Sequence, residues 1–116
     1  MNRDFRDYLS DILKSIENIE AFTNGMSYDE FVRDEKTVWA VIRGIEIIGE
    51  AVSKLPDEMK EKHEHIPWRE IRAMRNKLIH EYFGVNVRVL WVLFRKTFLP
   101  LSPTSLNLKK IVKSNG

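Results

Sequence analysis

The sequence predicts an all-α fold, namely an antiparallel up-and-down bundle of four to five helices. Apolar residues recur at helical spacing in several segments, and no stretch alternates apolar and polar residues for long. Residues typical of helix caps separate these segments. The chain of 116 residues is 43% hydrophobic and 31% charged, which suits one packed domain. We expect a helical domain over residues 1–100 and a tail or short helix over residues 101–116.

The first helix is predicted from an apolar seam of the kind by which bundle helices pack. Asn24 and Gly25 end this helix, because both residue types tolerate the left-handed conformation that follows a helix. Ser27 and Glu30 then have the spacing of a capping box, which opens a short helix. The seam consists of Phe5, Leu9, Ile12, Ile16 and Ile19.

A longer helix follows and stops at Pro56, because proline removes a backbone donor and clashes with the preceding turn. We place Pro56 as the first residue of another helical segment that reaches about His63. Pro67 has the same role at the start of a helix that reaches Phe83. The buried stripe of the longer helix is predicted to be Val38, Val41, Ile42, Ile45, Ile48, Val52 and Leu55.

The last long helix is predicted from Val87 to about Leu99, with Gly84 ending the previous helix and Asn86 as its cap. It is apolar on nearly all sides, since residues 87–94 read Val-Arg-Val-Leu-Trp-Val-Leu-Phe. A bundle helix needs only one apolar stripe, so we expect the second apolar face to pack against another subunit. The sequence therefore predicts a homodimer.

Composition argues against several classes of protein. Without cysteine there is neither a disulfide framework nor a thiolate metal site, and we expect a soluble protein of the reducing cytoplasm. No apolar run approaches the roughly 20 residues that cross a bilayer, and the charged N-terminus does not resemble a signal peptide. A net charge of +2 does not by itself require a nucleic-acid partner.

Two patterns that suggest ligand sites are weak. Gly44 and Gly49 have the spacing of a phosphate-binding loop, but Glu and Ala follow Gly49 where Lys and Ser or Thr are needed. His63 and His65 lie in a polar connector between prolines and do not form the i,i+4 pair of a zinc-binding helix. We expect no phosphate loop, no metal site and no cofactor.

The constellation that remains is at residues 75–82, which read Arg-Asn-Lys-Leu-Ile-His-Glu-Tyr. Metal-free RNA cleavage needs a base for the 2′-hydroxyl proton, an acid for the leaving 5′-oxygen and a cation for the charge on phosphorus. His80 suits the proton transfers, because an imidazole changes its charge near neutral pH. Arg75 suits the phosphate, because its planar guanidinium can donate two parallel hydrogen bonds.

The geometry of a straight helix complicates this assignment. Arg75 and His80 are about 140° apart around the axis, whereas Arg75 shares a face with Tyr82 and Asn76 shares one with His80. Three arrangements would bring Arg75 and His80 to one phosphate. The arginine side chain wraps around the helix, the helix distorts near Gly84, or two copies of the motif meet across a two-fold axis. The third agrees with the surplus apolar surface of the last helix.

Arg75, His80 and Tyr82 match the R-x4-H-x-Y signature of the HepT-like HEPN proteins, the ribonuclease toxins of prokaryotic toxin–antitoxin pairs. The chain resembles this family over roughly residues 1–100. Three segments outside the signature resemble the family's central helix, the entry to its motif helix and the exit from it: residues 45–51, 66–68 and 82–85.

The resemblance implies an all-helical homodimer and a metal-independent endoribonuclease, with Arg75 and His80 as the active pair and Asn76 as their polar neighbour. It also implies a partner encoded nearby, a minimal nucleotidyltransferase antitoxin that adds AMP to the motif tyrosine, here Tyr82. A nucleotide at that position would compete with RNA for Arg75 through its anionic charge and bulk. The C-terminal tail departs from the usual pattern of the family.

Other residues near the motif have two readings each. Arg69, Arg72 and Lys77 make the motif helix locally basic, and they either contact the RNA backbone or form a solvated face. Trp68 and Trp91 either stack on bases or pack in the core, and we expect packing.

Glu46 and Glu50 share a face of the longer helix. They either orient Arg75 or an antitoxin, or they form ordinary ion pairs. The spacing of Glu50 and Lys54 favours such a pair.

Two alternatives to the ribonuclease stay open. A non-catalytic helical module would bind a nucleotide or a nucleotidyltransferase through Arg75 and Tyr82 without RNA turnover. A purely structural dimerisation bundle would lose only stability on substitution of Arg75 and His80.

Overall fold

The computed structural model describes residues 4–80, 87–98, 110, 111 and 113. Over these residues the chain is an all-α bundle, as predicted, and no strand occurs among them. The predicted cap Asn86 and the predicted helix end at Gly84 lie outside the described residues. The helices are α1 (Phe5–Thr23), α2 (Tyr28–Arg33), α3 (Glu35–Lys54), α4 (Asp57–Lys62), α5 (Trp68–His80) and α6 (Val87–Phe98).

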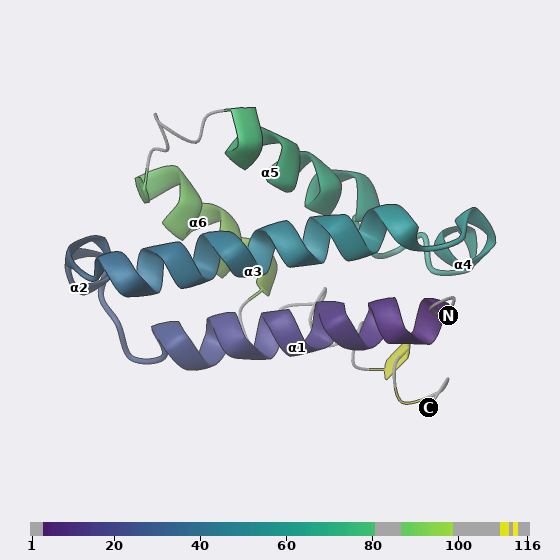
Figure 1. Cartoon of the computed structure of the whole chain (residues 1–116), viewed down its shortest axis with the longest axis horizontal. Coiled ribbons are helices and arrows are strands. Elements are labelled where there is room, and N and C mark those ends of the chain that lie inside the picture. Colours follow the sequence, from purple (N-terminus) through teal and green to yellow (C-terminus); the bar gives the residue numbers. More distant parts are fainter. Residues whose placement is uncertain (1–3, 81–86, 99–109, 112, 114–116) are drawn as a thin grey trace.

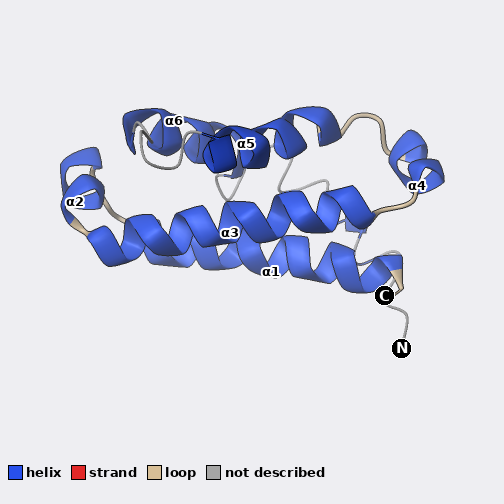
Figure 2. Ribbon diagram, turned by 45° about the horizontal axis from the view of Figure 1, so that its top comes forward, coloured by secondary structure: helices blue, strands red, loops and turns tan. Residues whose placement is uncertain are grey.

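Helix α3 is the centre of the bundle, because it packs against α1 on one side and against α5 on the other. Helices α1 and α3 run antiparallel along their full lengths, and α5 runs back across α3 (Figure 1). The short helix α4 turns the chain from α3 into α5, and α2 lies at the opposite end of the bundle (Figure 2). Helix α2 also contacts α6, so that the chain closes on itself at this end.

The helix ends are fixed by the cap chemistry that the sequence indicates. Asn24 is the C-cap of α1, and Gly25 follows with a φ of 75°, in the left-handed region where glycine has no steric penalty. Ser27 and Glu30 form the predicted capping box of α2: the Glu30 N–H donates to Ser27 Oγ at 3.2 Å, and the Ser27 N–H donates to the Glu30 carboxylate at 3.1 Å.

The prediction for the two prolines was wrong by one residue. Helix α4 begins at Asp57 with Pro56 as its N-cap, and α5 begins at Trp68, so each proline lies just before the first helical residue. We placed each proline as the first helical residue because a backbone N–H makes no intrahelical hydrogen bond there. The same holds for the residue just before the helix, so proline fits both positions. Their fixed φ directs the chain into each helix in either case.

The core follows the predicted stripes closely. The apolar seam of α1 is buried, with Phe5 packed at its edge, and the stripe of α3 is buried except for the partly covered Val38. Phe31 of α2 is fully buried and meets the ring of Phe94 of α6 at 5.4 Å. Ile111, in the short helical stretch of the tail that is described, is also buried.

Helix α6 has the surplus apolar surface that the sequence indicates. Its Leu90 and Phe94 are buried in the bundle, whereas Val89 and Val92 are exposed at 36% and 53%. The subunit contact predicted for this face therefore remains compatible with the described part of the helix.

None of the helices among the described residues has both the length and the apolar character that a membrane crossing requires.

Candidate functional site

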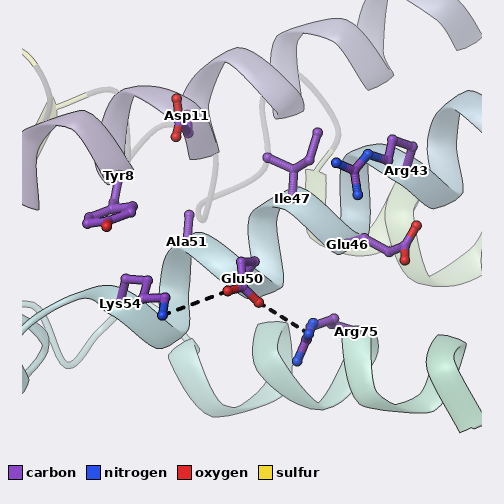
Figure 3. Close-up of a pocket in the computed structure, with 9 residues that line it drawn as sticks. All are labelled: Tyr8, Asp11, Arg43, Glu46, Ile47, Glu50, Ala51, Lys54 and Arg75. Atoms are coloured by element: carbon purple, nitrogen blue, oxygen red, sulfur yellow. Dashed lines mark ion pairs between the residues drawn. The ribbon is translucent and has the colours of Figure 1, made fainter. Parts of the chain in front are cut away.

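The guanidinium of Arg75 is the best-defined functional group of the predicted motif. Arg75 lies on α5, on the side that faces α3, and its side chain is 30% exposed. Its Nη2 lies 3.2 Å from Oε2 of Glu50, which projects from α3 toward it (Figure 3). The ion pair thus joins the motif helix to the central helix at the surface of the bundle.

Glu50 serves two cations at once. Its second oxygen, Oε1, lies 4.0 Å from Nζ of Lys54, one turn further along α3 (Figure 3). Glu50 and Lys54 each have side chains that are 54% exposed, so solvent screens both pairs and each contributes at most about 1 kcal/mol. Glu50 therefore restrains Arg75 only weakly, and it contacts the edge of the guanidinium at Nη2, one of the three nitrogens that carry its five N–H donors. Of the two readings for Glu50, the structure shows both: an ordinary pair with Lys54 and a direct contact with Arg75.

A cavity of about 380 Å³ opens beside this ion pair. Helix α1 contributes Tyr8 and Asp11 to its wall, and Arg75 stands at the edge supplied by α5 (Figure 3). The volume lies in the range of small-molecule sites in proteins. The wall holds three cationic and three carboxylate side chains, so the local charge is balanced. The lining residues are Tyr8, Asp11, Arg43, Glu46, Ile47, Glu50, Ala51, Lys54 and Arg75.

The other predicted polar residues of α5 are exposed. Asn76 follows Arg75 directly, and its side chain is exposed, as are those of Arg69, Arg72 and Lys77. Exposure leaves the three cations accessible to a phosphate backbone, and it equally fits a solvated face. Their contact with RNA stays a prediction.

The second half of the motif lies at the limit of the described structure. His80 is the last residue of α5, but its side chain is outside the described part, and Tyr82 lies wholly outside it. The distance between Arg75 and His80 is therefore not part of the described geometry. The three arrangements that would bring them together stay predictions.

Trp68 and Trp91 pack in or against the core, as expected. Trp68 is only 8% exposed, and its indole N–H donates to the backbone oxygen of His63 at 3.1 Å. Trp91 is partly buried against Phe31, with ring centroids 5.1 Å apart, and the guanidinium of Arg95 lies 4.5 Å from the Trp91 ring. Both indole rings pack against other side chains of the bundle, so neither offers an open face on which an RNA base could stack.

His63 and His65 lie in the connector between α4 and α5, with ring centroids 5.9 Å apart. In the described part of the chain, no group of three or more His, Asp or Glu side chains is placed to hold a metal ion.

Sequence reasoning missed Tyr8 and Asp11 as neighbours of the motif. Tyr8 directly precedes Leu9 and Asp11 directly precedes Ile12 of the α1 seam, so helical spacing identifies them only as lying beside the core. Their place in the cavity wall depends on how α1 crosses α3, which a single helical pattern does not specify.

Comparison with known proteins gives a consistent result. Residues 12–107 match the sequence model of the family described as "Ribonuclease HepT-like". A "Probable ribonuclease HepT" of Thermococcus cleftensis is 55% identical over 91 residues, which cover 78% of this chain and 83% of that protein. A "Putative RNase" of Methanocaldococcus jannaschii is 47% identical over 89 residues, 77% of this chain and 74% of that protein.

A "Putative RNase" of Caldanaerobacter subterraneus subsp. tengcongensis is 51% identical over 86 residues, which cover 74% of this chain and 77% of that protein. No solved structure matches the chain significantly. The family match spans most of the chain, including α3 with Glu50 and α5 with Arg75, whereas Tyr8 and Asp11 of the cavity wall precede it. The resemblance drawn from Arg75, His80 and Tyr82 is thus confirmed, and the chain belongs to the HepT-like ribonuclease family.

Proposed function

We propose that this chain is a metal-independent endoribonuclease that cleaves RNA with Arg75 and His80, and that it acts as the toxin of a toxin–antitoxin pair. The observation that carries the proposal is the placement of Arg75. Its guanidinium forms an ion pair with Glu50 at the edge of a cavity of about 380 Å³, and 30% of its side chain is accessible. The relatives named as ribonucleases support RNA as the substrate.

Besides the motif and the RNA, the reaction needs only water, which takes whichever proton-transfer role His80 does not take. The 2′-oxygen attacks the adjacent phosphorus and loses its proton to a base, while the bond from phosphorus to the 5′-oxygen breaks and that oxygen receives a proton from an acid. The products are a 2′,3′-cyclic phosphate and a 5′-hydroxyl. His80 serves as the base or as the acid, and Arg75 donates hydrogen bonds to the phosphoryl oxygens as negative charge builds on them. Asn76 adds a polar group next to Arg75.

RNA cleavage in the presence of EDTA tests this chemistry. The wild-type protein should yield 2′,3′-cyclic phosphate ends, and Arg75→Ala and His80→Ala should each lower the rate by about 100-fold or more. Arg33→Ala is a matched control, because Arg33 is an exposed arginine at the end of α2, remote in sequence from the motif. Cleavage that stops with the chelator, or that survives both motif substitutions, would refute the proposal.

The active site is proposed to be composite, with the motifs of two subunits meeting across a two-fold axis. The exposed Val89 and Val92 on α6 support a homodimer, because they extend the apolar surface beyond what the bundle covers. A heterodimer of one Arg75→Ala chain and one His80→Ala chain distinguishes the arrangements. If each site takes Arg75 from one subunit and His80 from the other, one of its two sites is intact and about half of the activity returns. If both residues act within one subunit, the mixture stays inactive.

The antitoxin is proposed to be a minimal nucleotidyltransferase that silences the toxin by adding AMP to Tyr82. The motif places Tyr82 seven residues after Arg75, two turns along a helical pattern. A phosphorylated nucleoside there would occupy the same groove as RNA and pair with the same guanidinium. Intact mass after co-expression with the neighbouring nucleotidyltransferase gene tests the idea. Tyr82→Phe should abolish a gain of whole AMP units, and wild-type protein without that gain would refute it.

A further inference from the structure

The side chain of Arg75 on α5 lies against Gly49 on α3. A Cβ atom placed on Gly49 would lie 2.8 Å from both Cγ and Cδ of Arg75, and closer still to the Cβ of Arg75. Contacts below 3.0 Å are essentially never made by real Cβ atoms. The apolar stem of Arg75 therefore lies directly on the bare backbone of Gly49, in space that any other residue would fill.

The backbone of Gly49 does not explain why glycine stands there. Among the described residues, only Gly25 has a positive φ, so Gly49 has the ordinary helical conformation that every residue adopts. Glycine inside a helix destabilises it relative to alanine. The buried Gly49, inside the C-terminal half of α3, thus has a steric reason, and the stem of Arg75 supplies it.

Gly49 and Glu50 together define both ends of the arginine side chain. Gly49 receives the stem, and the next residue of α3, Glu50, receives the Nη2 atom at 3.2 Å. An arginine has many rotamers, and one ion pair in solvent is a weak restraint on them. The close seat on Gly49 restricts the first torsions of the side chain, so that the guanidinium reaches Glu50 and the edge of the cavity.

We propose that Gly49 is a positioning residue for Arg75. The seat that it provides sets where the guanidinium stands, and a methyl group at this position would push the stem, and with it the charge, away from the scissile phosphate. The activity part of this inference rests on the proposed ribonuclease function, whereas the steric part does not.

Gly44 is the matched control on the same helix. A Cβ atom on Gly44 would meet only the outer carbons of Ile19, Cγ1 and Cδ1, at 3.0 Å. A rotation of the Ile19 side chain can relieve that contact, and Ile19 has no place in the motif. Gly44→Ala should therefore leave RNA cleavage within about two-fold of the wild type, because the added methyl group meets Ile19 and does not touch Arg75.

Gly49→Ala should lower the rate constant of RNA cleavage by at least about tenfold, since small displacements of a reacting group cost large factors in rate. A second parent protein, Arg75→Gly, serves as the control for effects on folding, because it lacks the side chain that contacts Gly49. In the wild-type background Gly49→Ala should lower the Tm, and in the Arg75→Gly background it should raise the Tm, because the methyl group then has room and alanine favours the helix. If Gly49→Ala lowers the Tm in both backgrounds, the contact with the Arg75 side chain does not explain the glycine, and the proposal is refuted.

Guanidinium added to the Arg75→Gly protein gives a readout that a purely structural role would not affect. The free ion should restore part of the cleavage, and Gly49→Ala in that background should leave the restored rate within about two-fold, because no stem remains to be displaced. A restored rate that falls with Gly49→Ala, or full cleavage by Gly49→Ala alone, would refute the positioning role. If the wild-type protein does not cleave RNA, the proposed function fails. The signs of the two Tm changes still test the steric contact between Gly49 and Arg75.

Discussion

Replacement of Trp68 by phenylalanine should destabilise the bundle at the start of the motif helix. The indole N–H donates to the His63 oxygen at 3.1 Å, and its loss costs about 0.5–1.5 kcal/mol. The His63 oxygen still accepts a hydrogen bond from the Ile66 N–H, at 3.0 Å, so the acceptor is not left bare and the lower half of that range applies. The smaller phenylalanine ring also leaves a cavity of roughly 40 Å³, because Trp68 is only 8% exposed and its site is closed to solvent. At about 24 cal/mol per Å³ this adds about 1 kcal/mol.

The sum of about 1.5–2 kcal/mol corresponds to a fall in Tm of about 6–8 °C for a domain of this size. Urea denaturation at fixed protein concentration measures the loss, because an unchanged m value shows that the same surface unfolds. Trp39→Phe is the control: the Trp39 side chain is 53% exposed, so the change should stay below about 0.5 kcal/mol. An unchanged midpoint for Trp68→Phe, or equal losses for both variants, would refute the account of Trp68 as the packed and hydrogen-bonded anchor of α5.

Three further changes test other parts of the structure. Gly25→Ala should cost about 1 kcal/mol in urea denaturation, because the φ of 75° is unfavourable for any residue with a Cβ. The Ser27 backbone N–H lowers the pKa of Glu30, so the stability from this carboxylate is complete above the ordinary value of 4.5 and is lost as the pH falls through the lower folded pKa. Glu30→Gln should therefore reduce the acid dependence of the Tm below that pH, and an unaltered pH profile would contradict the capping box. Val92→Asp should shift the protein toward the monomer in sedimentation velocity, because a charge would be buried in the proposed interface; an unshifted dimer would place the interface elsewhere.

Helix positions and the core could be predicted from the sequence because both follow from local rules. The seam of α1, the stripe of α3 and the capping box at Ser27 depend on residues within one or two turns of each other. The helix starts predicted at the two prolines were one residue too early, since proline fits both the residue before a helix and its first residue.

The candidate site could be predicted only in part. The motif itself named Arg75, and the spacing of Glu50 and Lys54 indicated their pair. The contact of Gly49 with Arg75 could not be predicted, because it depends on where α5 crosses α3, a property of two packed helices rather than of either sequence. Of the two glycines with phosphate-loop spacing, Gly49 thus lies against Arg75 of α5, whereas Gly44 faces Ile19 of α1.

The three tryptophans of the chain stand in three different environments, which makes the protein its own optical reporter. Trp39 is 53% exposed and within reach of a quencher dissolved in water, Trp68 is enclosed at 8%, and Trp91 lies beneath the guanidinium of Arg95 at 4.5 Å. Acrylamide should dim the red-shifted emission of Trp39 first and leave the blue-shifted emission of Trp68. Detachment of α5 from the bundle would therefore shift the emission maximum of Trp68 to longer wavelength, which can be measured without any attached dye.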